Sequence, residues 1–148
     1  MKQEYIISIE QSTQGTKALL FDCEGKLLFR EDLPHKQLVN EQGWVSHDLW
    51  EIRDNTIRAA KLLMEKASVS PGLIAAVGIS NQRETTAMWD RKTGEPLEHP
   101  VPCQCGRAPR IVRDIAQPAS GSIIMEKTGL HLSAYVPPAQ MSWLMQQN

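Results

Sequence analysis

Three short apolar segments within the first thirty residues constrain the fold more than any other feature of this sequence. They cover residues 5–9, 17–22 and 27–30, and polar stretches containing Gly15 and Gly25 separate them. Short apolar runs bounded by turn residues are typical of strands, and strands joined by such tight turns pair antiparallel. The sequence therefore predicts an antiparallel meander at the start of the chain.

A helix and a further strand are predicted to follow the meander. Asp48, with Glu51 three residues later, has the capping-box pattern, and apolar residues then recur at helical spacing as far as Leu63. This helix should end before Pro71. Residues 73–80 are almost continuously apolar, which favours a strand buried on both faces. The fold class expected is mixed α/β, with parallel and antiparallel strand pairs, and it suits a ribonuclease H-like or actin-like half-domain.

The rest of the chain is predicted to form shorter elements. After the polar residues 81–84 we expect a strand at 85–90, helices at 108–116 and 123–128, and a last helix that opens at Pro137 and continues to Asn148. The chain has one domain's worth of residues, and no repeat or internal linker interrupts it.

Composition argues against a polyanionic partner. Lys and Arg number 16 and Asp and Glu 17, so the net charge is −1, which gives no reason to expect nucleic acid or an anionic membrane. No apolar run approaches the roughly 18 residues of a membrane helix, and the first residues lack a signal-peptide core, so we expect a cytoplasmic protein. The three cysteines, Cys23, Cys103 and Cys105, should be reduced. The last two could be half of a metal site or, more simply, two semi-buried thiols in a loop.

Residues 10–17 form a polar loop between two predicted strands that could bind phosphate. Backbone N–H groups, the Thr13 and Thr16 hydroxyls and a flexible Gly15 could surround an anion, with the charge of Lys17 nearby. Glu10 could approach Mg²⁺ directly or through water, since magnesium favours carboxylates and retained waters. The alternative is that these residues serve turn chemistry alone.

A second polar cluster comes directly after the apolar segment 73–80. Ligands of open α/β sheets tend to bind at such carboxyl ends of strands. Arg83 and Glu84 offer donors and a charged acceptor that could fix two hydroxyls of a polyol, or they could form a surface salt bridge. Tyr135, further along, could stack on a sugar or act as an ordinary packing residue.

Three segments, at residues 9–25, 77–97 and 127–135, resemble in order and separation those of the FGGY carbohydrate kinase family, closest in motifs to its glycerol kinases. The resemblance implies phosphorylation of a sugar or polyol hydroxyl that depends on ATP and Mg²⁺. By position, it implies that Thr13 contacts the transferring phosphate, that Gln14 and Gly15 line the triphosphate, and that Lys17 lies near the nucleotide. The substrate hydroxyls would be held by Arg83, Glu84 and Tyr135.

Four positions depart from the family pattern. Glu10 stands in place of Asp, Ser12 in place of Gly, Cys103 in place of a substrate-packing Trp, and Cys105 in place of an acidic residue. The longer Glu10 side chain would shift a metal contact or make it water-mediated. The loss of the indole at Cys103 weakens the case for glycerol in particular, so another polyol or a ketose stays open.

The resemblance also implies that residues 1–148 are part of an N-terminal kinase domain. The catalytic base of the family comes from a later strand and its adenosine pocket from a C-terminal nucleotide domain, so we expect no catalytic residue in this chain and no activity from it alone. The alternatives are a non-catalytic polyol-binding module and another actin-like ATPase. An exposed sheet edge would favour a homo-oligomer.

Overall fold

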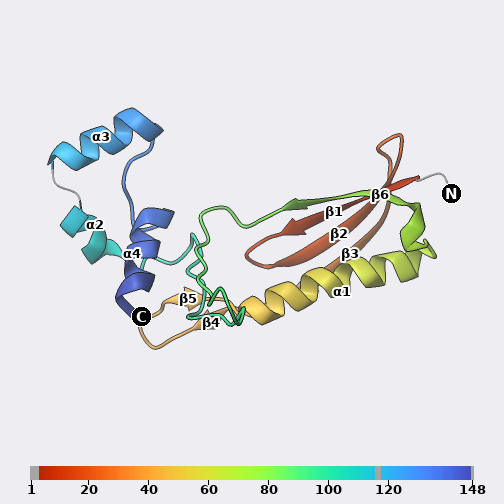
Figure 1. Ribbon diagram of the computed structural model, residues 1–148, viewed down its shortest axis with the longest axis horizontal. Helices are drawn as coiled ribbons and strands as arrows, with labels where there is room; N and C mark the ends of the chain where they lie inside the picture. Colours follow the sequence, from red (N-terminus) through yellow and green to blue (C-terminus); the bar gives the residue numbers. More distant parts are fainter. Residues whose placement is uncertain (1–3, 116–117, 148) are drawn as a thin grey trace. The chain divides into compact units, whose positions relative to one another are not determined.

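The structure is a computed structural model that describes residues 4–115 and 118–147 (Figure 1). The described chain divides into two compact units. Unit 1 comprises the residues up to Gln37 together with Asp48–Gln82, and unit 2 comprises Leu38–His47 together with the residues from Arg83 onward. The sequence analysis did not predict this division.

Unit 1 is built on a four-stranded sheet with the order β3-β2-β1-β6. β1, β2 and β3 form the predicted antiparallel meander, and β6 pairs parallel to β1. The mixed sheet expected from the sequence is therefore confirmed. The strands are β1 (Tyr5–Gln11), β2 (Gly15–Asp22), β3 (Leu27–Pro34) and β6 (Ile74–Ser80).

Helix α1 (Leu49–Ala67) lies along one face of this sheet (Figure 1). As predicted, Asp48 caps it, because its carboxylate accepts hydrogen bonds from the N–H groups of Trp50 and Glu51. The helix ends at Ser68, in the left-handed conformation with φ 53°, before the short 3-10 turn Pro71–Leu73. The core between helix and sheet consists of alternate strand residues and one helix stripe: Ile7, Ile9, Ala18, Leu20, Ala59 and Leu63.

Strand β6 differs from its prediction. It forms where expected, but it is not buried on both faces: Val77 is 55% and Ile79 65% exposed. Both residues share the helix-facing side of the sheet with Ile7 and Ile9, their register partners in β1. Because α1 packs mainly on β2 and β3, no described element of unit 1 covers β6 at the sheet edge.

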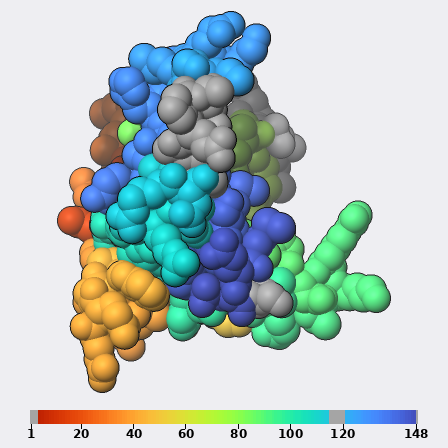
Figure 2. All heavy atoms as spheres, turned by 90° about the vertical axis from the view of Figure 1, so that its left-hand side faces the viewer, coloured from red at the N-terminus to blue at the C-terminus, as the bar shows by residue number. Residues whose placement is uncertain are grey.

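Unit 2 contains a small antiparallel pair, β4 (Leu38–Val39) and β5 (Val45–Ser46), and three helices. The helices are α2 (Pro109–Ile115), α3 (Pro118–Thr128) and α4 (Pro137–Gln147). All three were predicted, although Ala116 and Asn148, the predicted ends of two of them, lie outside the described residues. Figure 2 shows α2 (teal) beside α4 (dark blue), and the two helices contact each other.

The strand predicted at residues 85–90 is wrong. Only two isolated bridges form there, Thr86 with Val101 and Trp89 with Pro96. The segment opposite contains Pro96, Pro100 and Pro102, which have no backbone N–H to donate, so a continuous ladder cannot form. Within residues 4–115 and 118–147, no helix has both the length and the apolar character to cross a membrane.

Candidate functional site

The polar loop after β1 is a tight turn held by hydrogen bonds at its base. β1 and β2 pair as far as Gln11 and Thr16, and the turn then closes because the N–H and the hydroxyl of Ser12 both donate to the Gly15 carbonyl, each at 2.9 Å. Thr13 and Gln14 form its tip. Within the described ranges, the Thr13 hydroxyl makes no hydrogen bond to another residue, which leaves it available to a ligand.

Gly15 is not the flexible hinge that the sequence suggested. It is a buried residue of β2, and a Cβ atom built on it would lie 2.5 Å from the carbonyl oxygen of Leu33 in β3. Glycine is required here by close approach of two backbones and not by an unusual φ angle. The turn is therefore fixed against β3 on one side.

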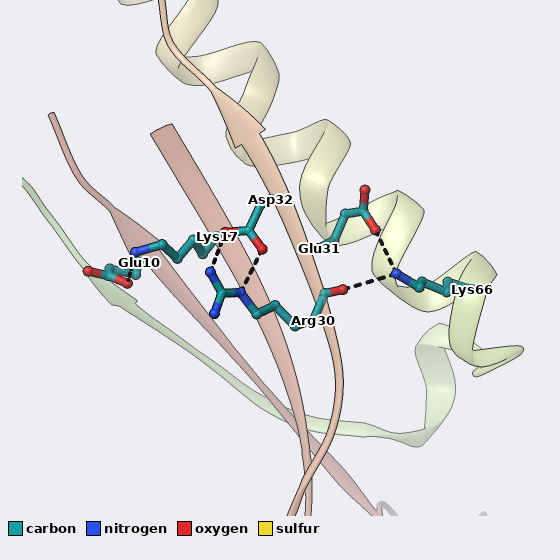
Figure 3. A network of polar contacts seen from close by, with 6 residues as sticks. All are labelled: Glu10, Lys17, Arg30, Glu31, Asp32 and Lys66. Atoms are coloured by element: carbon teal, nitrogen blue, oxygen red, sulfur yellow. Dashed lines mark hydrogen bonds and ion pairs between the residues drawn. The ribbon is translucent and has the colours of Figure 1, made fainter. Parts of the chain in front are cut away.

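Charged side chains from three strands gather on the sheet face opposite α1 (Figure 3). Lys17 Nζ lies 2.9 Å from Glu10 Oε2. Beside this pair, Arg30 holds Asp32 in a fork, with Nε to Oδ2 at 2.6 Å and Nη2 to Oδ1 at 2.8 Å. The hydrogen bond from Arg30 lowers the pKa of the Asp32 carboxyl. The arrangement places one cation, Lys17, between two carboxylates next to the turn.

A depression of about 220 Å³ opens between the turn and the end of β3. Three of the four residues predicted to bind phosphate, Gln14, Gly15 and Lys17, line it, whereas Thr13 does not. Its other lining residues are Ser12, Thr16, Asp32, Leu33 and Pro34. The structure therefore brings most of the predicted phosphate-binding set together in one place in unit 1.

The fit of a magnesium ion depends on Glu10. Among the described residues, no group of three His, Cys, Asp or Glu side chains could hold a metal ion. Glu10 is the single carboxylate at the carboxyl end of β1, and its side chain is half exposed. Because Mg²⁺ commonly takes one or two carboxylates and completes its shell with phosphates and water, Glu10 fits as one ligand of a metal that a nucleotide carries.

Arg83 and Glu84 open unit 2 in an irregular turn. Both side chains are exposed, and in the part of the chain that the structure describes neither has an ion-pair partner, so the surface salt bridge considered above is not formed. The backbone of Glu84 is left-handed, with φ 56°. A glutamate in this conformation stores strain of about 1–3 kcal/mol, and such outliers cluster at functional sites.

Tyr135 lies in a different part of unit 2. Its phenol ring lies over Gly106, so that a Cβ on that glycine would come within 3.4 Å of the hydroxyl oxygen, and the residue is 53% exposed. The carbonyl of Tyr135 accepts a hydrogen bond from Gln140 Nε2 at 3.1 Å, and the fully buried Gln140 also accepts from the Thr86 hydroxyl at 2.7 Å. The tyrosine is thus fixed by its backbone while its ring stays accessible.

A buried arginine that the sequence analysis missed organises unit 2. The guanidinium carbon of Arg107 lies 5.5 Å from the centre of the Trp44 ring and 4.8 Å from that of Trp143. Arg107 also donates to the Val45 carbonyl, to the Ser46 hydroxyl and to Cys105 Sγ. Since the Trp44, Val45, Ser46 and Trp143 partners are far from Arg107 in the sequence, no local pattern could have revealed the cluster. Cys105 is buried and Cys103 half-buried, which supports the thiol interpretation of this pair.

Comparison with known proteins then identifies the group to which this chain belongs. The N-terminal domain of the FGGY family of carbohydrate kinases matches residues 5–148. The chain belongs to the FGGY family. It is 37% identical over 142 residues to a glycerol kinase of Caldanaerobacter subterraneus subsp. tengcongensis, and 38% identical over 141 residues to glycerol kinase 1 of Thermotoga maritima.

Solved FGGY structures are similar in fold as well. A glycerol kinase of Plasmodium falciparum with ADP has a TM-score of 0.83 and 33% identity over 99% of this chain, and a gluconate kinase of Lactobacillus acidophilus has a TM-score of 0.85 over 97% of it. At 24% identity, the second shows the fold alone. The actin-like fold class is therefore confirmed. The chain spans 29% of the length of the two bacterial glycerol kinases and of the Plasmodium structure.

Proposed function

We propose that the intact protein containing this FGGY chain is a cytoplasmic kinase that transfers the γ-phosphate of ATP to a hydroxyl of glycerol or of a related polyol or ketose. The observation that carries the proposal is the edge of the sheet where β1 and β6 end. These parallel strands bring the turn after Gln11 and the segment before Arg83 to the same edge of unit 1, which is where α/β sheets bind ligands. The described cysteines are free, which suits a reducing compartment.

The turn in unit 1 has the role of holding the phosphates of ATP. Thr13 contributes its hydroxyl to the transferring phosphoryl group, while Gln14 and Gly15 line the triphosphate and Lys17 supplies positive charge beside them. Fixed donors of this kind stabilise the charge on the equatorial oxygens without reorganising during transfer. When Mg²⁺ is bound it neutralises phosphate charge, and Glu10 would hold it directly or through a water molecule.

The exposed charges in unit 2 have the role of holding the acceptor. The Arg83 guanidinium donates to hydroxyl oxygens, and the Glu84 carboxylate accepts from hydroxyl protons, so together they can fix a vicinal diol. Tyr135 covers the apolar face of the acceptor with its ring. No base for the attacking hydroxyl is assigned within this chain. Residues 1–148 are proposed to be part of an N-terminal domain, with the base and the adenosine pocket supplied by a nucleotide domain outside it.

The test is phosphorylation by the intact protein. ADP release is measured with glycerol, other polyols and ketoses, with and without Mg²⁺, for the wild type and for Arg83→Ala. Release that needs both acceptor and metal, and that falls at least tenfold in Arg83→Ala, supports the proposal. Calorimetric binding of a polyol without ADP release would favour the binding module, and acceptor-independent ATP hydrolysis that survives Arg83→Ala would favour another actin-like ATPase.

We also propose that the 148-residue chain self-associates through β6. Val77 and Ile79 leave an apolar patch beside an unpaired strand edge, and such edges pair with other chains unless a charge blocks them. Ile79→Lys should therefore raise the monomer fraction measured by light scattering, whereas Val39→Lys, at a similarly exposed apolar residue of β4 in unit 2, should not. A clean monomer for the unmodified chain contradicts this proposal.

A further inference from the structure

A buried polar network lies beneath the phosphate-binding turn. The Gln11 side chain is 9% exposed, Thr16 is fully buried, and His35 is 7% exposed. The Gln11 amide lies 2.6 Å from Thr16 Oγ1 and 2.6 Å from His35 Nε2, and Thr16 Oγ1 lies 3.1 Å from the same ring nitrogen. These residues come from the ends of β1 and β2 and from the residue after β3, so the network joins all three strands directly below the turn.

The network extends in two directions. On one side, the Asn55 amide of α1 lies 3.1 Å from His35 Nδ1 and 3.1 Å from the Pro34 carbonyl oxygen. On the other side, the side-chain amide of Gln82 lies 2.9 Å from that of Gln11. Gln82 follows β6 and directly precedes Arg83 in the chain. One side chain, Gln11, therefore contacts both the base of the turn and the residue before the acceptor-binding pair.

The Gln11 amide is bonded at both of its ends. Its oxygen accepts a hydrogen bond from Gln82 Nε2 at 2.9 Å, and its NH₂ group donates to Thr16 Oγ1 at 2.6 Å. One buried amide therefore joins the residue before Arg83 to the base of the turn. Buried networks with every group satisfied hold their members in a single geometry.

We infer that Gln11 is a positioning residue that couples the phosphate-binding turn to the acceptor-binding residues Arg83 and Glu84. It touches neither ligand. It fixes the base of the turn through Thr16 and His35, and it fixes the start of the acceptor segment through Gln82. The inference rests on the proposed kinase function, but the hydrogen bonds that carry it do not.

The kinetic test is a double-mutant cycle in the intact protein. Gln11→Met and Gln82→Met should each raise the KM for the polyol by about five- to tenfold, and the double variant should be no worse than either, because both remove the same link. Gln42→Met, in an exposed loop, is the matched control and should leave KM unchanged. Multiplying effects in the double variant, or an unchanged KM in Gln11→Met with only a lower melting temperature, would overturn the inference.

A conservative variant tests the direction of the hydrogen bonds. Gln82→Glu removes the donor to the Gln11 oxygen and sets two acceptors against each other, so it should raise KM at least as much as Gln82→Met. If Gln82 were instead the acceptor, the KM of Gln82→Glu would stay within about twofold of wild type.

Amide hydrogen exchange separates this inference from the proposed function. Gln11→Met should speed exchange in residues 81–84, and Gln42→Met should not. If the wild type phosphorylates no acceptor but this exchange response is seen, the kinase proposal fails and the coupling stands. If phosphorylation is normal and exchange in residues 81–84 does not respond, the coupling fails alone.

Discussion

The two units hold their candidate ligand-binding residues in different ways. In unit 1 the turn that we propose to bind phosphate continues a regular antiparallel ladder whose pairing runs up to Gln11 and Thr16. In unit 2 the residues that we propose to bind the acceptor lie on irregular backbone, and single side chains such as Gln140 and Arg107 connect its segments. A strand ladder is stabilised by many hydrogen bonds, whereas contacts that all depend on one side chain are lost together in a single substitution. We therefore expect the largest single effects in unit 2.

Removing the Arg107 side chain should destabilise unit 2. Arg107→Ala abolishes two cation–π contacts and three hydrogen bonds at a buried position, and we expect it to destabilise the protein by about 3 kcal/mol. Calorimetric unfolding measures the loss. Arg110→Ala, at an exposed position of α2, is the control. An effect of equal size in both variants would show that the contacts of Arg107 do not stabilise unit 2 more than an exposed arginine does. Arg107→Lys should recover little, because an ammonium group lacks the planar fork.

Two strand glycines sharpen the comparison within unit 1. Gly15→Ala would drive a Cβ into the Leu33 carbonyl and should cost about 1–3 kcal/mol while weakening ATP binding. Gly78→Ala in β6 meets no atom within 4 Å, so it should be neutral or stabilise by up to about 1 kcal/mol. Urea unfolding and nucleotide titration compare them. Equal stability of the two variants contradicts the close approach that we assign to Gly15.

Glu84 provides a test in which stability and function should move in opposite directions. Glu84→Gly removes the strain of a residue with a side chain in the left-handed backbone conformation, so it should stabilise the protein by about 1 kcal/mol. The same variant should lose polyol binding, because the carboxylate is gone. Glu84→Gln keeps the strain and loses only the charge, so it should weaken polyol binding with little change in stability. A destabilised Glu84→Gly would mean that the carboxylate has a structural partner.

The smallest expected effect is acid sensitivity at one carboxylate in each unit. The pKa of Asp32 is lowered chiefly by its hydrogen bond from Arg30, and that of Asp90 by the backbone N–H groups of Thr93 and Lys92. A carboxyl group whose pKa is lowered by folding stabilises the protein at pH values above its ordinary pKa of 3.8. This contribution is lost as the pH falls through the pKa of the folded state. Asp32→Asn and Asp90→Asn should therefore each flatten the loss of stability below about pH 4. Both groups are exposed, so the change should be slight.

Local patterns in the sequence predicted what local physics determines. The meander, the cap at Asp48, the end of its helix and all three later helices have signals within a few residues. The exposure of β6 was missed because its apolar composition is the same whether or not another element covers it. The strand at 85–90 was over-predicted because the prolines that prevent its ladder lie in a separate segment.

The candidate site divides in the same way. Thr13, Gln14, Gly15 and Lys17 could be predicted as one group because they are consecutive or nearly so, and three of them, Gln14, Gly15 and Lys17, line one depression. The network around Gln11 was missed because His35, Asn55 and Gln82 meet it only after folding. The role of Gly15 was misjudged for a related reason: the need for a residue without a Cβ comes from Leu33, on another strand.

The arginine between two indoles also gives unit 2 an intrinsic optical signal. The Trp44 and Trp143 rings meet edge to face, 5.6 Å apart, in the field of a fixed guanidinium. Indole emission shifts with the local electric field, so loss of this cluster should change the fluorescence spectrum. Trp89 is 61% exposed, so it should contribute little change on unfolding. Trp50 of unit 1 has the Arg53 guanidinium carbon 5.0 Å from its ring centre, so Trp50→Phe would remove the signal of unit 1 and leave tryptophans that report on unit 2 alone.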